Sequence, residues 1–332
     1  MRHVFIIFTL LIVFTLFLPL HEAQARRSDG MQEVAIIVTS SANDVTVGTN
    51  DVTVGTKRTY FIYVPSSYTR SRKAPLIIGL HGGGGTAEAF ADTAQFNPLA
   101  ASDGIIMVYP QGLGNGKGGT WNSGGPPDGY AEKNNIDDVG FIRDVIAKVR
   151  AEYSIDESRI YATGMSKGGM LSYRLACEMA PTFAAIAPVA ATMTYAPCAP
   201  TSPVAVFHTH GTADENVPFE GGRGKDSNVN GDWPPVMNGI DGWRTIDGCD
   251  PGATVSSAGS PTRDSTCNEY PGCQRGTAVR YCLIKGGGHA WPGAPLNRWQ
   301  INSGQKQSNF PTTTEIWSFF SAHPKHQEMR DR

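Results

Sequence analysis

The sequence predicts an α/β protein in which helices cover both faces of a mainly parallel sheet. Short apolar runs alternate with segments whose apolar residues recur at helical spacing, which is typical of such folds. The 38 glycines and 22 prolines indicate many loops between short elements. Only 17% of the residues are charged and the net charge is −2, so no basic surface indicates a nucleic acid or an anionic membrane as a partner.

Regular elements are expected from Arg58 onward. A helix is predicted over 138–153 because apolar residues recur there at helical spacing, and the carboxylates of Asp137 and Asp138 suit the start of a helix. A second helix is predicted over 167–179 and a closing helix over 313–321. The apolar runs predict strands at 59–64, which we expect at an edge of the sheet, and then at 75–80, 105–109, 159–163, 183–190, 204–208 and 279–284.

The N-terminus has the features of a secretory signal peptide over 1–25. A positive start precedes the apolar stretch 4–20, and Ala23-Gln24-Ala25 fits a cleavage site. An uncleaved anchor is the alternative, because the apolar stretch reaches the lower limit of a membrane span. Cleavage predicts a secreted protein, extracellular or periplasmic, with no membrane association. In the following segment, 26–57, seven residues at 43–49 recur unchanged at 50–56, and we interpret this duplication as exposed and without chemistry.

Six cysteines follow the signal, at 177, 198, 249, 267, 273 and 282. An even number in an exported chain indicates disulfides, and the spacing does not fit a zinc site, so no metal is expected. Proximity favours Cys177 with Cys198, which leaves four cysteines to pair in the region 249–282. Most of that region belongs to a loop-rich insert, 220–277, that is rich in Gly, Asp, Pro and Ser.

The run Gly164-Met-Ser166-Lys-Gly168 carries the main chemical signal. It lies between a predicted strand and a predicted helix, where a serine occupies a sharp and strained turn. Glycines two positions away on both sides relieve the crowding there, and the helix N-terminus directs N–H groups toward whatever the hydroxyl attacks. A serine nucleophile needs a base, and that base needs an acceptor that orients it.

Two later strand ends supply these partners. His289 follows the predicted strand 279–284, and Asp214 follows 204–208, so both are expected at the carboxyl edge of the sheet. Their order after Ser166 is the order expected for this arrangement. Glu215 is the nearest competitor of Asp214 and spacing alone does not exclude it. His208 lies within a strand, where we expect it to pack.

Donors for an oxyanion are expected from two backbone N–H groups. One belongs to Lys167, which follows the serine, and the other to Gly83 in the run His81-Gly-Gly-Gly-Gly85 after an early strand. His81, Trp121 and Trp291 lie in loops near these positions and are candidates for contact with a substrate, because an indole can stack on a sugar or a phenolic ring. For Trp291, simple packing is an equal alternative.

Six segments together resemble secreted polyhydroxybutyrate depolymerase-like esterases, which are related to the feruloyl and acetylxylan esterases of carbohydrate esterase family 1. The similarity extends from 58 to 323, the expected catalytic domain, and leaves 324–332 as a polar tail. Relatives often have cysteines in the loop after Trp121-Asn122, whereas this chain has none there. The segments are His81-Gly-Gly-Gly, Trp121-Asn, Asp137-Asp-Val-Gly-Phe, Gly164-Met-Ser-Lys-Gly-Gly, His210-Gly-Thr-Ala-Asp and Gly288-His-Ala-Trp-Pro-Gly.

The resemblance implies an α/β-hydrolase fold, ester hydrolysis through an acyl-enzyme without a cofactor, and a triad of Ser166, Asp214 and His289. The expected substrates are feruloyl or acetyl esters of plant polysaccharide, or polyhydroxybutyrate-type esters, and the sequence does not decide between them. Two alternatives stay open: an acyltransferase on the same fold, and a non-catalytic homologue that binds polysaccharide or polyester. The oligomeric state is also open, with a monomer expected.

Overall fold

The computed structural model describes residues 30–38, 45–46, 53–54 and 56–325, apart from short gaps at 117, 127–128, 226–230, 253, 256–261, 297–299, 302–305 and 307. The predicted signal peptide at 1–25 lies outside these residues. Among the residues that are described, no helix is long and apolar enough to cross a membrane.

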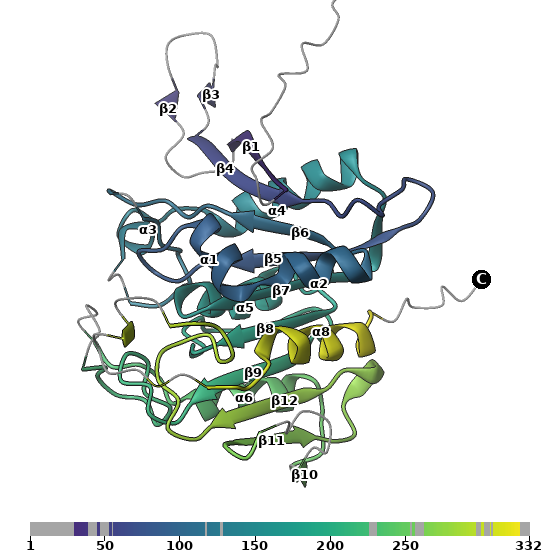
Figure 1. Cartoon of the computed structure of the whole chain (residues 1–332). Coiled ribbons are helices and arrows are strands. Elements are labelled where there is room, and N and C mark those ends of the chain that lie inside the picture. Colours follow the sequence, from purple (N-terminus) through teal and green to yellow (C-terminus); the bar gives the residue numbers. More distant parts are fainter. Residues whose placement is uncertain are drawn as a thin grey trace, which may run out of the picture.

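One twisted sheet runs through the whole domain (Figure 1). Its strand order is β1-β4-β6-β5-β7-β8-β9-β12-β11-β10, and the six strands from β6 to β12 in this order pair in parallel. The parallel strands are β5 (Ala74–Leu80), β6 (Ile106–Pro110), β7 (Ile155–Met165), β8 (Ala185–Val189), β9 (Ala205–Gly211) and β12 (Val279–Ile284). The predicted mainly parallel sheet is therefore confirmed.

Antiparallel strands complete both edges of the sheet. On one side β4 (Thr56–Tyr63) pairs with β6, and β1 (Met31–Val38) pairs with β4 over its full length. The prediction that the strand near 59–64 forms an edge is wrong, because β1 adds a further strand from the segment before it. On the other side lie β11 (Ser265–Tyr270) and β10 (Thr254–Val255).

The duplicated heptapeptides pair with each other. The strands β2 (Val45–Thr46) and β3 (Thr53–Val54) form a separate antiparallel pair, in which Val45 lies opposite Val54. One copy thus supplies β2 and the other supplies β3, beside the sheet edge (Figure 1).

Helices cover both faces of the sheet, as predicted. The larger apolar core lies under α4 (Asp138–Glu152), α5 (Lys167–Glu178) and α6 (Val236–Ile246), and the second core lies on the opposite face under α1 (Ala87–Ala94), α2 (Phe96–Asp103) and α8 (Thr312–Ala322) (Figure 1). The apolar side chains of β7 alternate between these two cores: Ile160 and Ala162 face one, and Tyr161 faces the other. Two short helical turns, α3 (Tyr130–Lys133) and η1 (Gln274–Gly276), lie in loops.

The insert is more ordered than its composition predicts. It contains α6, whose buried residues include Ile240 and Trp243, and the strands β10 and β11. Three disulfides tie this half of the chain together: Cys177–Cys198, Cys249–Cys273 and Cys267–Cys282. The predicted pairing of Cys177 with Cys198 is confirmed, and so is the pairing of the other four among themselves.

Candidate active site

Ser166 lies on the tight turn between β7 and α5. Its backbone has φ 54° and ψ −122°, a strained conformation that non-glycine residues rarely adopt. Its N–H donates to the carbonyl of Val189 on β8 at 2.9 Å. A Cβ on Gly168 would come within 2.2 Å of the Leu80 carbonyl oxygen, and one on Gly164 within 2.6 Å of Gly168. The glycines on both sides of the serine are thus required by close backbone contacts.

Asp214 and His289 form a hydrogen-bonded pair at the carboxyl edge of the sheet. His289 Nδ1 donates to Asp214 Oδ2 at 2.8 Å, and both side chains are buried. The second oxygen, Oδ1, accepts the backbone N–H groups of Asn216 at 2.9 Å and Val217 at 2.8 Å. Burial by itself raises the pKa of Asp214, but the charge and hydrogen bond of His289, with contributions from His210 and Val217, outweigh it and hold this pKa below its usual range.

Backbone contacts fix the loops that carry this pair. Ala213 donates its N–H to the carbonyl of Gly287 at 2.8 Å, and Gln300 Nε2 donates to the carbonyl of His289 at 3.1 Å. Glu215, the competitor of Asp214, extends outward and pairs with Lys225 at 2.7 Å on the surface. The geometry therefore brings Asp214, not Glu215, to His289.

A small apolar cluster joins the serine turn to the acid loop. Met170, one helical turn after Ser166, packs with Val217, Ala191 and Trp233. The same Val217 donates its N–H to the Asp214 carboxylate. Ser166, Asp214 and His289 thus follow the parallel strands β7, β9 and β12 at one edge of the sheet. The contact of Met170 with Val217 connects the serine turn with the Asp214 loop.

The residues that carry the two predicted oxyanion donors, Gly83 and Lys167, are in contact. A Cβ on Gly83 would be 3.3 Å from Cγ of Lys167, and one on Gly82 would be 3.5 Å from Cβ of Ser166. Within the described part of the chain, the Gly83 N–H has no hydrogen-bond partner. The glycine loop after β5 therefore borders the serine directly and keeps a backbone donor available beside it.

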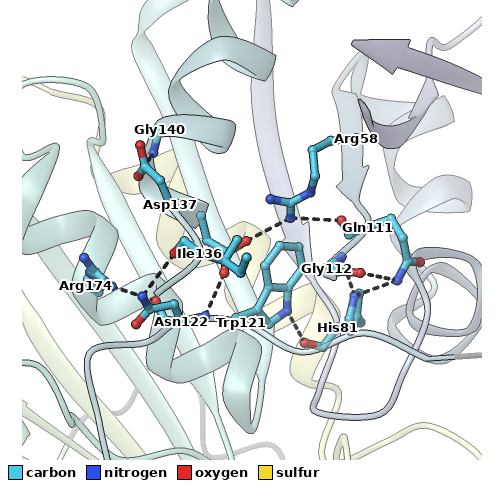
Figure 2. A network of polar contacts seen from close by, with 11 residues as sticks. Arg58, His81, Gln111, Gly112, Trp121, Asn122, Ile136, Asp137, Gly140 and Arg174 are labelled. Carbon is cyan, nitrogen blue, oxygen red and sulfur yellow. Dashed lines mark hydrogen bonds and ion pairs between the residues drawn. The ribbon is translucent and has the colours of Figure 1, made fainter. Parts of the chain in front are cut away.

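His81 and Trp121 are buried and pack against the backbone of the glycine loop. Gly112 donates its N–H to His81 Nε2 at 2.9 Å, so the proton is on Nδ1, which donates to the carbonyl of Gly82 at 2.8 Å. Burial lowers the pKa of His81 to about 4. Trp121 Nε1 donates to the carbonyl of His81 at 2.8 Å (Figure 2). Both side chains thus support the loop.

Trp291 is also buried, with 2% of its surface exposed. Its indole meets the edges of Phe90 and Phe96, and its Nε1 donates to Thr313 Oγ1 at 3.0 Å. The alternative of simple packing therefore describes its environment. The three aromatic side chains expected to contact substrate all lie in the interior.

Sequence reasoning missed a buried ion pair next to the serine. Lys167 Nζ donates to Glu132 Oε1 at 2.7 Å, and the two side chains are 9% and 3% exposed. Glu132 belongs to α3, in the loop that follows Trp121 and Asn122, and the ring centre of Trp233 lies 5.4 Å from the ammonium. No sequence signal singled out Glu132, because a short polar turn gives no periodicity.

A second buried network supports the loop that contains Trp121. Arg58 Nη2 on β4 contacts Asp138 Oδ1 at 2.8 Å, and the other oxygen of Asp138 accepts the Asn122 N–H at 2.7 Å. The Asn122 carbonyl accepts from Arg174 on α5 at 2.9 Å. Figure 2 shows how Arg58, Asn122 and Arg174 connect β4, this loop and α5. Within the described residues, no group of three or more His, Cys, Asp or Glu side chains is arranged to hold a metal ion.

Residues 58–212 match the family model described as Esterase PHB depolymerase. Feruloyl esterase B of Piromyces equi is 30% identical over 70% of this chain, which spans only 42% of that relative. The probable feruloyl esterase C of Aspergillus clavatus is 29% identical over 80% of this chain and 84% of its own length.

A solved structure agrees in fold. The acetyl xylan esterase from Aspergillus awamori superposes with a TM-score of 0.56 at 15% identity, covering 88% of this chain and 99% of that one. Together with the parallel sheet and its two helical layers, this likeness establishes the α/β-hydrolase fold. Residues 58–212 of this chain match the Esterase PHB depolymerase family model, and the relatives of the chain are named esterases.

Proposed function

We propose that this chain is a secreted serine esterase that cleaves carboxylic esters through an acyl-enzyme. The observation that carries the proposal is the juxtaposition of a strained serine turn with a buried His289–Asp214 pair, 2.8 Å long, at the same sheet edge. The three disulfides support export, because such bonds persist in oxidising compartments.

The reaction would proceed in two halves. Ser166 Oγ attacks the ester carbonyl while His289 Nε2 takes its proton, and Asp214 stabilises the imidazolium that forms. The negative charge on the carbonyl oxygen is held by the backbone N–H groups of Gly83 and Lys167. His289 then protonates the leaving alkoxide as the C–O bond breaks. In the second half, His289 takes a proton from the water that attacks the acyl-enzyme, and it returns that proton to Ser166 Oγ as the bond to the acyl group breaks and the acid leaves.

For the substrate we propose feruloyl or acetyl esters of plant polysaccharide. The two relatives described above favour this class, since both are named feruloyl esterases. Because His81, Trp121 and Trp291 are buried, ring stacking on these side chains does not contribute to recognition. Hydrolysis of methyl ferulate, acetylated xylan and hydroxybutyrate oligomers should be compared side by side. A higher kcat/KM for the oligomers than for the other two would assign the chain to polyesters instead.

The Ser166→Ala variant tests the nucleophile. We expect p-nitrophenyl acetate hydrolysis to fall by at least about 10⁴-fold and labelling by a fluorophosphonate to disappear, with unchanged thermal unfolding, because the reacting oxygen is removed. Ser172→Ala is a matched control: this serine lies on the same helix, and its hydroxyl donates to the Gly168 carbonyl. Turnover in Ser166→Ala comparable to that of the control would reject Ser166 as the nucleophile.

A further inference from the structure

A chain of three buried side chains connects α5 with the Asp214 loop. The hydroxyl oxygen of Tyr173 on α5 lies 2.9 Å from His208 Nδ1, and His208 Nε2 lies 3.1 Å from His210 Nδ1. His210 Nε2 lies 2.8 Å from the Val217 carbonyl oxygen and 3.5 Å from Asp214 Oδ2. All three side chains are fully buried. The two histidines share one face of β9 because they are two residues apart, and their rings are nearly parallel, with an angle of 11° between the ring planes.

The last acceptor determines every proton position in this chain. A carbonyl oxygen can only accept, so His210 Nε2 must carry a hydrogen and donate it to Val217. With His210 neutral, its Nδ1 is then an acceptor, and His208 must donate from Nε2. His208 Nδ1 in turn accepts the hydroxyl hydrogen of Tyr173. Burial lowers the pKa of both histidines, which supports the neutral forms.

The last side chain of this hydrogen-bonded series, His210, lies beside Asp214. Val217 is held from both sides: its carbonyl accepts from His210, and its N–H donates to Asp214 Oδ1 at 2.8 Å. The other carboxylate oxygen, which accepts from His289, is 3.5 Å from the His210 N–H group. Loss of the His210 donor would leave the buried carbonyl of Val217 without a partner and allow the acid loop to shift.

The first side chain of this hydrogen-bonded series, Tyr173, lies on the helix that begins after the serine. Tyr173 is seven residues, about two helical turns, beyond Ser166. The chain therefore links the helix of the nucleophile to the loop of the acid across β9. Neither histidine contacts the proposed reacting atoms, so neither qualifies as a catalytic residue.

We propose that Tyr173, His208 and His210 are positioning residues that hold the Asp214 carboxylate in the orientation in which it accepts the hydrogen bond of His289. This inference rests on the proposed function. Because these hydrogen bonds run in series, removal of the Tyr173 hydroxyl leaves His208 Nδ1 without a donor and loosens the buried histidines that hold the Asp214 loop.

Steady-state kinetics with p-nitrophenyl acetate test the proposal. We expect Tyr173→Phe to lower kcat by about 3- to 10-fold with KM unchanged, because one buried hydrogen bond at the head of the chain is lost. His210→Leu should lower kcat by about 30- to 100-fold, and His210→Gln should recover part of this loss because its amide can still donate to Val217. Tyr161→Phe is the matched control, since the hydroxyl of this buried tyrosine on β7 has no hydrogen-bond partner in the described structure.

Proton NMR separates this inference from the proposed function. The His289 Nδ1–H resonance should be observed in the inactive Ser166→Ala protein, and it should shift or broaden when Tyr173→Phe is added but not when Tyr161→Phe is added. Wild-type kcat and an unshifted resonance in Tyr173→Phe would overturn the positioning role, even if thermal stability fell. If His210→Leu does not fold, Tyr173→Phe decides alone. An inactive wild type would reject the proposed function, whereas the His289 resonance would still test the positioning role of Tyr173, His208 and His210.

Discussion

Two buried aspartates hold loops at the candidate site, and they differ in their cationic partner. Asp138 lies behind the glycine loop and pairs with Arg58 at 2.8 Å, whereas Asp214 pairs with His289 at the same distance. Both carboxylates also accept backbone N–H groups, from Asn122 in one case and from Asn216 and Val217 in the other. The two environments are therefore alike in burial and hydrogen bonding.

The difference lies in what the partner can do with a proton. A guanidinium stays charged at all accessible pH values, so the Arg58–Asp138 pair is fixed. An imidazole can take up and release a proton, so the His289–Asp214 pair can change its charge during a reaction. We infer that the first pair stabilises the architecture of the site and that the second performs chemistry. Substitutions at the two aspartates should therefore have opposite profiles.

Asp214→Asn should produce the largest effect on activity. The amide cannot stabilise an imidazolium at His289 and favours the wrong tautomer, so we expect kcat for p-nitrophenyl acetate to fall by about 10³- to 10⁴-fold. Unfolding in urea should change less than in the corresponding variant of Asp138, because the amide oxygen can still accept the N–H groups of Asn216 and Val217. A kcat within tenfold of wild type would remove Asp214 from the proposed triad and end the contrast between the two aspartates.

Asp138→Asn should produce the largest effect on stability. It leaves the guanidinium of Arg58 buried without its counter-charge, which costs about 3–5 kcal/mol of unfolding free energy. The double variant Arg58→Met with Asp138→Asn is the control, and it should regain most of that loss because no buried charge is left unpaired. Equal destabilisation of the single and double variants would show that the loss of stability does not come from the unpaired charge of Arg58.

Strand ends were the part of the site that the sequence could predict. The strand over 279–284 was predicted with its observed bounds, and parallel strands necessarily bring the residues after them to one edge, so Asp214 and His289 could be named together. The edge strand β1 was not predicted, because nothing in its local sequence shows that it pairs with β4. The helix α6 was missed within an insert whose composition indicates loops.

Burial inside loops was the part that the sequence could not predict. His81, Trp121 and Trp291 lie in loops near the serine, and nothing in their spacing shows whether a loop side chain points outward or into the interior. Each is fixed in the interior by a hydrogen bond to a residue distant in sequence, such as Gly112 for His81 and Thr313 for Trp291. Glu132 was missed for the same reason, since its partner Lys167 is 35 residues away.

A third buried aspartate extends the comparison to a carboxylate without a cation. Asp247 follows α6; its Oδ1 accepts the Val204 N–H at 3.2 Å, and its Oδ2 has no hydrogen-bond partner in the described structure. Burial raises the pKa of Asp247 to about 7. The folded protein thus binds this proton more tightly than the unfolded chain, so the stabilisation is present at low pH and is lost as the pH rises to about 7.

Asp247→Asn should therefore stabilise the protein at pH 8, where the wild type must bury an ionised carboxylate. We expect an increase of about 2–4 kcal/mol in the free energy of unfolding at pH 8 and little difference at about pH 3, where the aspartate is largely protonated in both states. Urea unfolding at these two pH values measures the effect, and Asp241→Asn, at a half-exposed position on α6, serves as the control. Destabilisation at pH 8 would mean that the ionised carboxylate is stabilised in the fold, and Asp247 would then resemble Asp138 instead of standing apart from it.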